Sequence, residues 1–482
     1  MKLSDLLQGL QPMEIHADLD LEIPFVTSDS RKVVPGSLFV AVTGFAADGN
    51  RFIPMAAEKG AAVVATTKKP ELDIPYVLVE SDRYALAVIG ANYYGRPSKD
   101  MVMVGVTGTN GKTSTTWLLK QVIQGVKGAK VGLIGTMENH IGDLVLPTDR
   151  TTPESIELQA LFAQMRDAGC SYAVMEVSSH SLVLDRVAGI HFDVAAFTNL
   201  TPDHLDFHKT MEEYCDAKAI LFSRCGKAVV NGDDGWHDRV IKDCNAPVLT
   251  TSVQGHGMLN AENICMQADG VSFTAVHGEK RVEISVPIPG QFTVYNVLSV
   301  LGIALQLGIE LEETAAVLRN VSGVKGRVEV VPTPGKPYTV LIDYAHTPDG
   351  LENVLSSVRG FCKGRLIALF GCGGDRDTTK RPVMGKIAVD IADVVVITSD
   401  NPRTESPATI IGHIVAGLGD AKNYHVIENR VDAIHFAMDI AKKDDIIVLA
   451  GKGHETYQEI MGKKNHFDER EVVASYLEEK RN

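Results

Sequence analysis

The chain has 482 residues, which is too many to pack around a single hydrophobic core, so its length predicts about three domains. A net charge of −14 argues against nucleic acid or an anionic membrane as the main partner, and a content of 45% hydrophobic and 22% charged residues is ordinary for a globular protein. The seven cysteines form no C-x-x-C pair, no apolar run approaches the ~20 residues of a membrane span, and the N-terminus has no signal-peptide core, so we expect a cytoplasmic protein with reduced thiols.

Residues 1–98 are expected to form a first domain of short strands separated by turns. The strands are predicted at 38–42, 61–65 and 76–79. The stretch 95–100 combines glycine, proline and charged residues, and we expect it to be a linker.

Residues 99–330 are expected to form a second domain, because strands alternate with helices from Met101 onward. This alternation indicates a mostly parallel sheet covered on both faces. The predicted strands are 101–106, 131–135, 172–177 and 193–198. The predicted helices are 112–126, 153–168, 210–224, 294–307 and 311–319, and the stretch from 227 to 290 is richer in strands and turns.

Residues 331–482 are expected to form a third domain, a doubly wound α/β unit of the Rossmann-like kind. Its predicted strands are 338–343, 366–370, 394–398 and 446–450, and its predicted helices are 380–391, 408–418 and 430–442. Ligands of such sheets bind beyond the carboxyl ends of the strands. Four polar strings follow these strands, and together they predict a site: 343–346, 371–376, 400–403 and 451–455.

The segment Gly108-Thr-Asn-Gly-Lys-Thr113 lies between a predicted buried strand and a predicted helix. When a strand, a glycine turn and a helix follow one another, the backbone N–H groups of the turn and of the first helical residues are directed at phosphate oxygens. Lys112 can reach the β- and γ-phosphates, and the Thr113 hydroxyl can hold Mg²⁺. Val106 stands where the first glycine of G-x-x-x-x-G-K-[ST] belongs. An ordinary glycine turn is the alternative, but the flanking strand and helix favour a site for ATP.

Further polar residues follow other strands of the second domain. Glu176 ends an apolar run, so we expect it at the same sheet edge as the phosphate loop, where it would hold Mg²⁺ or form a salt bridge. The loop 198–208 contains two His and two Asp, and either His is a metal ligand or a hydrogen-bonding group. Taken alone, Lys218 is a solvated helix lysine. Asn296 and Arg327 are helix-cap or surface residues, or contacts to a nucleotide.

In this order the chain carries the motifs T-G-T-N-G-K-T, E-V-S-S-H, T-N-L-T-P-D-H-L-D-F-H, Y-x-x-A-K, G-V-x-G-R, D-Y-A-H-T-P, G-C-G-G-D-R-D, D-N-P-R and G-K-G-H-E. Together they resemble the Mur ligases of peptidoglycan precursor synthesis, and most closely the MurE-type members that add the third amino acid. The resemblance covers essentially the whole chain. It implies a three-domain, ATP- and Mg²⁺-dependent amide ligase, monomeric and cytoplasmic, with a central P-loop-type domain and a C-terminal Rossmann-like domain. Its acceptor substrate would be UDP-N-acetylmuramoyl-L-alanyl-D-glutamate.

The resemblance also implies roles for individual residues. The ATP-binding residues would be Gly108, Thr109, Asn110, Gly111, Lys112, Thr113, Ser114, Asn296, Arg327 and Asp343. The residues that hold Mg²⁺ would be Thr113, Glu176, His204 and Lys218, with Lys218 modified to N6-carboxylysine. The catalytic residues would be Lys112, Glu176, His204 and Lys218. The UDP-substrate contacts would be Ser30, Thr151, Thr152, Ser178 and Arg186. The contacts to the incoming amino acid would be Arg376, Asp400, Asn401, Pro402, Arg403, Gly451 and Glu455.

The D-N-P-R string bears on which amino acid is added. Meso-diaminopimelate carries a carboxylate beside its distal ammonium, whereas lysine has the ammonium alone. A guanidinium pairs with that carboxylate in a bidentate way and repels a lone ammonium. Arg403, with Glu455, therefore favours diaminopimelate, and L-lysine is the alternative substrate.

Two further alternatives concern the class of protein. Another Mur ligase or a folylpolyglutamate synthetase belongs to the same superfamily, but Asp29-Ser-Arg31 and the D-N-P-R string argue against both. A P-loop NTPase without ligase activity belongs to a different class. Such a protein would have no reason to carry Arg376, Asn401 and Arg403 on a separate domain.

Overall fold

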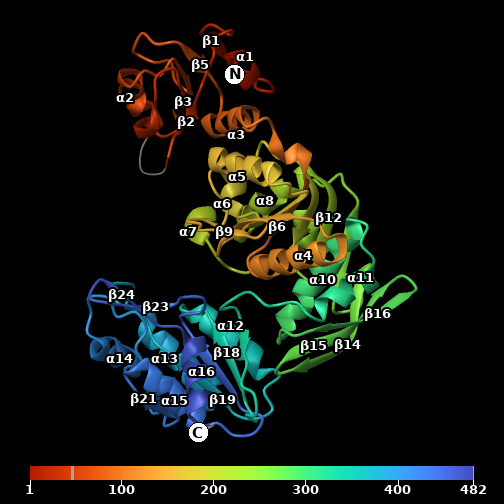
Figure 1. The fold of residues 1–482 in the computed structure, drawn as a ribbon, viewed down its shortest axis with the longest axis vertical. Helices are drawn as coiled ribbons and strands as arrows, with labels where there is room; N and C mark the ends of the chain where they lie inside the picture. Colours follow the sequence, from red (N-terminus) through yellow and green to blue (C-terminus); the bar gives the residue numbers. More distant parts are fainter. Residues whose placement is uncertain (45–47, 481–482) are drawn as a thin grey trace. The chain divides into compact units, whose positions relative to one another are not determined.

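The computed structural model describes residues 1–44 and 48–480, and Figure 1 labels its helices and strands. The chain divides into two units, which are residues 1–260 with 298–314 and residues 261–297 with 315–482. The polypeptide therefore passes from one unit to the other after residues 260, 297 and 314. The domain boundaries predicted from the sequence lie elsewhere, near residues 98 and 330, and they stay predictions.

The N-terminal part of the first unit is a five-stranded sheet with the strand order β1-β5-β4-β3-β2. Its strands are β1 (Glu14–His16), β2 (Val26–Thr27), β3 (Leu38–Val40), β4 (Val63–Thr66) and β5 (Tyr76–Leu78). Its helices are α1 (Leu3–Leu6), α2 (Ile53–Glu58) and α3 (Asp82–Tyr93), with 3-10 turns at Ser30–Lys32 and Gly49–Phe52. Only β1 is antiparallel to its neighbour. The three strands predicted in this region are confirmed.

The stretch 95–100, predicted to be a linker, joins α3 to the strand that begins at Val102, and part of it is buried. Residues Pro97–Asp100 form a 3-10 turn, η3, in which Pro97 and Ser98 are buried. The preceding Arg96 adopts a left-handed backbone with φ of 53°.

A larger sheet follows, with the strand order β13-β12-β11-β6-β10-β7-β8-β9. Its strands are β6 (Val102–Thr107), β7 (Val131–Ile134), β8 (Asn139–Ile141), β9 (Leu144–Leu146), β10 (Tyr172–Glu176), β11 (Phe192–Phe197), β12 (Cys225–Asn231) and β13 (Val248–Ser252). Its helices are α4 (Lys112–Lys127), α5 (Ser155–Asp167), α6 (Ser179–Val183), α7 (Leu205–His208), α8 (Met211–Ala219) and α9 (His237–Val240). Apart from β8 and β9, these strands are parallel, as predicted.

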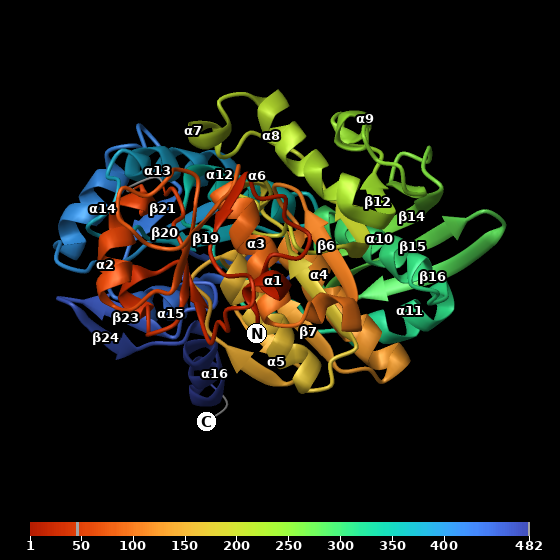
Figure 2. The same cartoon turned by 90° about the horizontal axis from the view of Figure 1, so that it is seen from above.

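Strand β6 occupies the middle of this sheet, between β10 and β11. Helix α4 packs on one face and α5 lies on the other (Figure 1). Figure 2 shows α6 beside α8, which packs against it. The predicted helix 210–224 ends as α8 at Ala219 and continues as a 3-10 turn, Ile220–Arg224. The loop after β6 therefore starts from an interior strand of the sheet.

Strands also dominate the stretch from 227 to 290, as predicted. Strand β14 (Leu259–Gln267) begins in the first unit, where Leu259 and Asn260 pair with β13. In the second unit, β15 (Gly270–His277) and β16 (Lys280–Val286) form an antiparallel hairpin. The two helices that follow are α10 (Gln291–Gln306) and α11 (Leu311–Leu318).

The C-terminal sheet of the second unit has the strand order β17-β18-β22-β19-β20-β21. Its strands are β17 (Glu329–Val331), β18 (Thr339–Asp343), β19 (Leu366–Phe370), β20 (Val394–Ile397), β21 (Tyr424–Val426) and β22 (Ile446–Ala450), and a separate hairpin consists of β23 (Tyr457–Ile460) and β24 (Lys463–His466). Its helices are α12 (Pro348–Arg359), α13 (Lys380–Ile391), α14 (Pro407–Val415), α15 (Arg430–Ile440) and α16 (Glu469–Glu479). One core joins the sheet to α12, α13 and α14, and another joins it to α15 and α16. The predicted doubly wound arrangement is confirmed.

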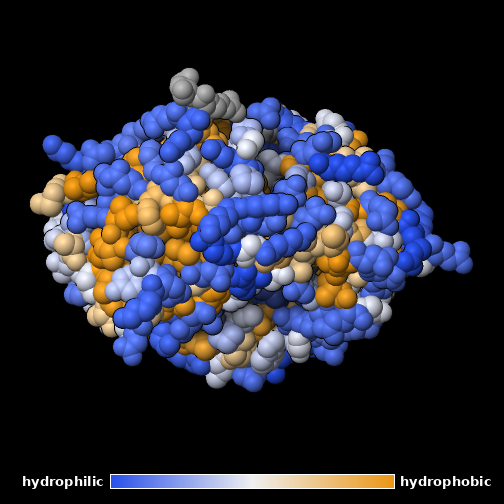
Figure 3. Space-filling model, turned by 90° about the horizontal axis from the view of Figure 1, so that it is seen from below, coloured by the Kyte–Doolittle hydropathy of each residue, from blue (hydrophilic) through white to orange (hydrophobic). Residues whose placement is uncertain are grey.

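The exposed large apolar side chains are distributed along the chain. On the face drawn in Figure 3, patches of apolar residues are bordered by polar ones. Such a mixture is ordinary, because apolar atoms contribute much of any protein surface. Among residues 1–44 and 48–480, no helix is both long enough and apolar enough to cross a membrane.

Candidate active site

The loop between β6 and α4 requires its glycines. Gly108 has φ of 146° and Gly111 has φ of 86°, both unfavourable for other residues. A Cβ atom on Gly108 would also run into the Thr198 hydroxyl. That hydroxyl donates to the Asn110 carbonyl at 2.6 Å, so the end of β11 fixes the loop. The predicted strand, glycine turn and helix are therefore present in the expected order.

The amides of this loop fall into two groups. Those of Thr109 and Asn110 donate to the carbonyl and side-chain oxygens of Asn199, at 2.8 and 2.9 Å. The amides of residues 111–114 belong to the start of α4, where helix geometry supplies no intrahelical acceptor. The amides of residues 111–114 are therefore the ones that can bind an anion, with the positive end of the helix dipole beside them.

Two lysines contact the same loop. The Lys112 ammonium donates to the carbonyls of Gly108 and Thr109, each at 2.8 Å. Lys218, on α8, donates to the Gly108 carbonyl at 3.0 Å and lies 4.3 Å from the centre of the Tyr214 ring. Lys218 is 1% exposed, so its interpretation as a solvated helix lysine is wrong. Burial, and secondarily the charge of Lys112, lowers the pKa of Lys218 well below its usual value.

Glu176 emerges beside the loop, as predicted from its position at the end of a strand. Strand β10 pairs with β6 so that Glu176 lies opposite Val106. One carboxylate oxygen of Glu176 accepts the Thr113 hydroxyl at 3.0 Å, and the other accepts the Thr136 amide at 2.8 Å. The carboxylate is 1% exposed. A hydroxyl and a buried carboxylate are thereby brought together beside the helix start.

His204 lies in a different environment. It has a left-handed backbone with φ of 53°, and its side chain is 48% exposed. Its ring centroid lies 4.9 Å from that of His180 and 6.1 Å from that of Tyr214. Within the described ranges, no group of three or more His, Cys, Asp or Glu residues is arranged to hold a metal ion. Of the four metal ligands predicted, the structure brings Thr113 and Glu176 into contact.

The residues assigned to the peptide part of the acceptor gather at the end of β10. The Thr152 hydroxyl donates to the Glu176 carbonyl at 2.9 Å and accepts the Ser178 amide at 3.2 Å. Arg186 donates to the Thr152 carbonyl at 3.0 Å, and Thr151 shares a 3.0 Å hydrogen bond with Thr136. Four predicted residues thus form one continuous network with Glu176.

Ser30 belongs to the N-terminal sheet. It is buried, and its hydroxyl lies 3.5 Å from the Met55 sulfur. The neighbouring Asp29 accepts two hydrogen bonds from the Arg31 guanidinium, both at 2.9 Å. This pairing lowers the pKa of the Asp29 carboxyl.

In the second unit, the loops after β20 and β22 meet around the buried Lys452. Its ammonium donates to Asn401 Oδ1 at 3.0 Å and lies 3.3 Å from Asp400 and 3.6 Å from Glu455. Because Asn401 Oδ1 also accepts the Glu459 amide, its amide nitrogen is directed to Glu455, at 2.8 Å. Lys452 therefore fixes the orientation of a predicted ligand residue.

Arg403 is held by a second set of contacts. It has φ of 52°, donates to the Gly374 carbonyl at 2.7 Å and lies 3.3 Å from the Glu459 carboxylate. Within residues 1–44 and 48–480, no hydrogen bond or ion pair joins Arg403 to Glu455. Asn401 bonds to both Glu455 and the Glu459 backbone, and Glu459 pairs with Arg403. Pro402 is buried beside Asn401, with its carbonyl against Gly374.

Arg376 and Gly451 complete the residues predicted for the amino acid. Arg376 is exposed and donates to the neighbouring Asp375 carbonyl. Gly451 has φ of 115°, and a Cβ atom there would lie 2.8 Å from an Asp400 oxygen. The close approach of these two loops therefore requires a glycine.

The three residues expected to meet the nucleotide from outside the phosphate loop differ in their contacts. Asn296 is buried on α10. Arg327 lies with its guanidinium carbon 5.4 Å from the centre of the Tyr344 ring. Asp343 is buried, and its carboxylate accepts the amides of Val328 and Ala345 at 2.9 and 2.8 Å. Burial raises the pKa of Asp343, and the carboxylate acts in the structure as a brace for the segment after Arg327.

Sequence reasoning missed four residues that organise these sites. Asn199 belongs to the motif T-N-L-T-P-D-H-L-D-F-H and Lys452 belongs to G-K-G-H-E, but neither residue was assigned a role. A motif therefore could have signalled both. Thr136 and Glu459 stand in no such motif, so only the fold reveals them.

Comparison with protein families places three matches along the chain. Residues 22–101 match the family model described as Mur ligase family, catalytic domain. Residues 106–304 match the Mur ligase middle domain, and residues 326–453 match the Mur ligase glutamate ligase domain.

Among curated proteins, the chain is similar to UDP-N-acetylmuramoyl-L-alanyl-D-glutamate–2,6-diaminopimelate ligase 1 of Clostridium acetobutylicum. The two are 48% identical over 99% of this chain and 100% of the relative. The similarly named ligase of Bacillus cereus is 44% identical over 99% and 98% of the two chains.

Among solved structures, one of a UDP-N-acetylmuramoyl-L-alanyl-D-glutamate–2,6-diaminopimelate ligase is 31% identical, with a TM-score of 0.79 over 100% of this chain and 99% of that one. The MurF ligase of Thermotoga maritima in complex with ADP is 20% identical, with a TM-score of 0.60 over 96% and 99%. At that identity the second likeness establishes the fold alone.

Proposed function

The chain belongs to the Mur ligase family, and we propose that it adds meso-diaminopimelate to the D-glutamate of UDP-N-acetylmuramoyl-L-alanyl-D-glutamate while cleaving ATP to ADP and phosphate. The observation that carries this proposal is the Arg403, Asn401 and Glu455 arrangement of the second unit, held by Lys452 and Glu459. The Arg403 guanidinium can pair with the distal carboxylate of diaminopimelate, and the Glu455 carboxylate can pair with its distal ammonium.

The nucleotide would lie on the amides of residues 111–114, with Lys112 over the phosphates. Thr113 and Glu176 fit Mg²⁺, because they supply a hydroxyl and a carboxylate, the hard oxygen donors that this ion prefers. Lys218 fits only as a carbamate, since an ammonium would repel the ion. When bound, Mg²⁺ neutralises the charge that develops on the transferred phosphoryl group.

The reaction divides into two steps. An oxygen of the D-glutamate side-chain carboxylate attacks the γ-phosphorus, the bond to the β-phosphate oxygen breaks, and ADP leaves. The amine of diaminopimelate then attacks the carbonyl carbon of the acyl phosphate, phosphate leaves, and the amine loses a proton. Thr152, Ser178 and Arg186 would orient the peptide, and Lys112 would stabilise negative charge, so the chain contributes alignment and electrostatics.

The wider setting follows from the same assignment. We infer a monomeric cytoplasmic enzyme with neither a nucleic acid nor a membrane partner, in keeping with its net charge of −14. Its domains would be 1–98 for the UDP-substrate, 99–330 for ATP and 331–482 for the amino acid.

Phosphate release tests the proposal against a P-loop NTPase without ligase activity. It is measured with ATP and Mg²⁺ plus the UDP-dipeptide alone, the amino acid alone, or both. We expect release at the full rate only with both, in a one-to-one ratio with the amide product. Release that ignores the two substrates would exclude a ligase.

A substrate panel then separates the two candidate amino acids. The panel compares meso-diaminopimelate, its LL and DD isomers, L-lysine and L-ornithine. We expect meso-diaminopimelate to have the highest kcat/KM, and a preference for L-lysine would replace the specificity assignment while leaving the ligase intact.

A further inference from the structure

A pocket of about 540 Å³ lies in the first unit, away from the phosphate loop. Its walls come from α3, from the 3-10 turn η3, and from the loop that precedes β11. The volume falls within the range typical of small-molecule sites. None of the roles assigned above uses this pocket.

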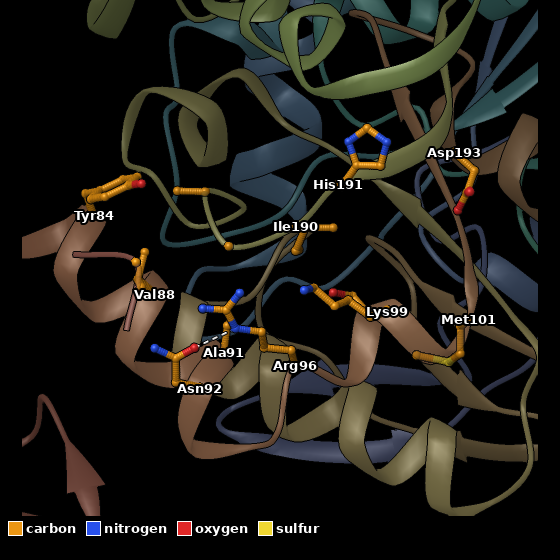
Figure 4. Close-up of a pocket in the computed structure, with 14 residues that line it drawn as sticks. Tyr84, Val88, Ala91, Asn92, Arg96, Lys99, Met101, Ile190, His191 and Asp193 are labelled. Carbon is orange, nitrogen blue, oxygen red and sulfur yellow. Dashed lines mark hydrogen bonds between the residues drawn. The ribbon is translucent and has the colours of Figure 1, made fainter. Parts of the chain in front are cut away.

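Three side chains give the pocket its chemistry. Arg96, Lys99 and His191 line it, and Figure 4 shows the Arg96 guanidinium and the Lys99 ammonium directed toward the same central space, with the His191 ring on another side. Asp193 is the carboxylate of the lining, and one of its oxygens accepts the Met103 amide at 2.7 Å. In a chain with a net charge of −14, this group of basic side chains is local.

Arg96 is preorganised, but not all of its donors are used. Its Nε donates to Asn92 at 2.7 Å and one terminal nitrogen donates to the Gln8 carbonyl at 3.1 Å. Asn92 is in turn held by the carbonyls of Leu6 and Gln8, at 2.9 and 2.8 Å. The second terminal nitrogen, Nη1, has no hydrogen-bond partner within residues 1–44 and 48–480. Arg96 also keeps a left-handed backbone, a strain that proteins tend to retain at functional positions.

Lys99 and His191 add donors without structural duties. Across the described ranges, neither side chain has a hydrogen bond or an ion pair. The remaining walls include Val88, Ile190 and Met101, which are apolar and buried. Small residues, among them Ala91 and Gly189, leave the centre open. The lining thus combines basic and apolar side chains.

We propose that this pocket binds a small organic anion whose phosphate or carboxylate group meets Arg96, Lys99 and His191 while its apolar part packs against Val88 and Ile190. Arginine and lysine are the usual partners of both kinds of anion, and charge-assisted hydrogen bonds are the strongest that side chains form. The proposal does not rest on the ligase assignment, because no ligase substrate is required at this pocket.

The test is a binding measurement on the full chain by isothermal titration calorimetry. The background is Lys112→Ala, which weakens anion binding at the phosphate loop. Phenyl phosphate and benzoate share a ring and differ in the charged group, and inorganic phosphate lacks the ring. We expect saturable one-to-one binding of phenyl phosphate or benzoate, whichever charged group the site selects, and weaker binding of inorganic phosphate.

Variants then locate the bound anion. Lys99→Ala and His191→Gln together, in the same background, are expected to weaken binding about tenfold or more. Lys443→Ala, an exposed lysine of the second unit, is the matched control and should change nothing. In the otherwise wild-type chain, the Lys99 and His191 substitutions should leave ligase activity intact. Absence of saturable binding, or binding that ignores both substitutions, would overturn the proposal.

Discussion

At the scale of single residues, the most specific assignment concerns Arg403. Its guanidinium is held in one orientation by the Gly374 carbonyl and the Glu459 carboxylate. We expect Arg403→Ala to lower kcat/KM for diaminopimelate roughly 100-fold, since a positioned charge pair is lost, and to leave the KM for ATP unchanged. Steady-state kinetics with each substrate varied in turn measures both.

Arg403→Lys is the matched variant, because it keeps the charge and removes the two-pronged geometry. It should recover only part of the activity of the wild type. Wild-type diaminopimelate kinetics in Arg403→Ala would contradict the specificity argument.

Lys218 illustrates a residue whose chemistry follows from its burial. Its lowered pKa enlarges the neutral fraction near neutral pH, and a neutral amine is the form that reacts with CO₂ to give a carbamate. We expect Lys218→Met to lose activity by about 100-fold or more. We also expect ¹³C-bicarbonate to produce a carbamate carbon signal in the wild type and none in Lys218→Met.

The same substitution carries a stability prediction. In the chain without the carbamate, the folded state binds a proton at Lys218 less readily than the unfolded state, so stability rises with pH between the lowered pKa and the usual one near 10.5. Lys218→Met should lack this contribution and should melt no lower than the wild type at neutral pH. A large loss of melting temperature would mean that inactivity reflects misfolding instead.

Residues differ in how well the sequence predicts them. Glu176 was predictable, because the end of a parallel strand next to β6 leaves little choice of position. Lys218 was not, since its burial depends on α8 packing over Gly108, a contact between residues far apart in the chain. The pairing of Arg403 with Glu459 was also beyond reach, because it depends on the β23 hairpin meeting the D-N-P-R loop.

At the scale of elements, the loop after β19 is fixed by a buried arginine from α13. Arg381 is fully buried and pairs with Glu405 through two hydrogen bonds of 2.9 and 2.8 Å. It also donates to the Gly373 carbonyl. The pairing lowers the pKa of Glu405 to about 2 from its usual 4.5. The carboxylate thus joins the segment after Asp400 to the loop that carries Arg376.

A pH prediction follows from this pair. Because the folded pKa of Glu405 is the lower one, its stabilising contribution is present above about pH 4.5 and is lost as pH falls toward 2. We expect Glu405→Gln to lower the melting temperature at pH 7, since it leaves Arg381 buried without its counter-charge. The difference from the wild type should shrink as pH falls below 4.5. A difference that is constant with pH would contradict the role of the charge.

Elements were predictable where their pattern was long and regular. The eight strands predicted by residue range in these two sheets lie within a residue or two of their predicted bounds, because fully apolar runs bounded by polar strings have few alternatives. Strands β12, β13 and β21 were not predicted individually. Helix α12 was missed although Leu351, Val354, Leu355 and Val358 are all buried with helical spacing. No element was predicted over these residues, and Pro348 is no obstacle to the helix, because proline is well tolerated in the first turn.

At the scale of the whole molecule, the apolar and polar patterns of the three predicted domains indicated the α/β architecture correctly. They did not indicate the path of the chain between the two units. That path runs through β14, α10 and α11, which no local pattern marks as crossings. The C-terminal sheet, in contrast, is built from consecutive elements. Strand β17 pairs with β18, and Asp343 braces Val328, so the segment just before the predicted boundary contributes to this sheet.

A pair of fragments tests where the C-terminal domain begins. Residues 326–482 retain the complete sheet and both of its cores, so we expect this fragment to fold cooperatively. Residues 332–482 lack β17 and leave the buried Asp343 carboxylate without the Val328 amide, which should lower stability by about 1–3 kcal/mol or more. Urea denaturation followed by circular dichroism measures the difference. Both fragments should be less stable than the same region in the full chain, because Met266 and Phe292 also pack against one of these cores. Equal stability of the two fragments would place the boundary after β17.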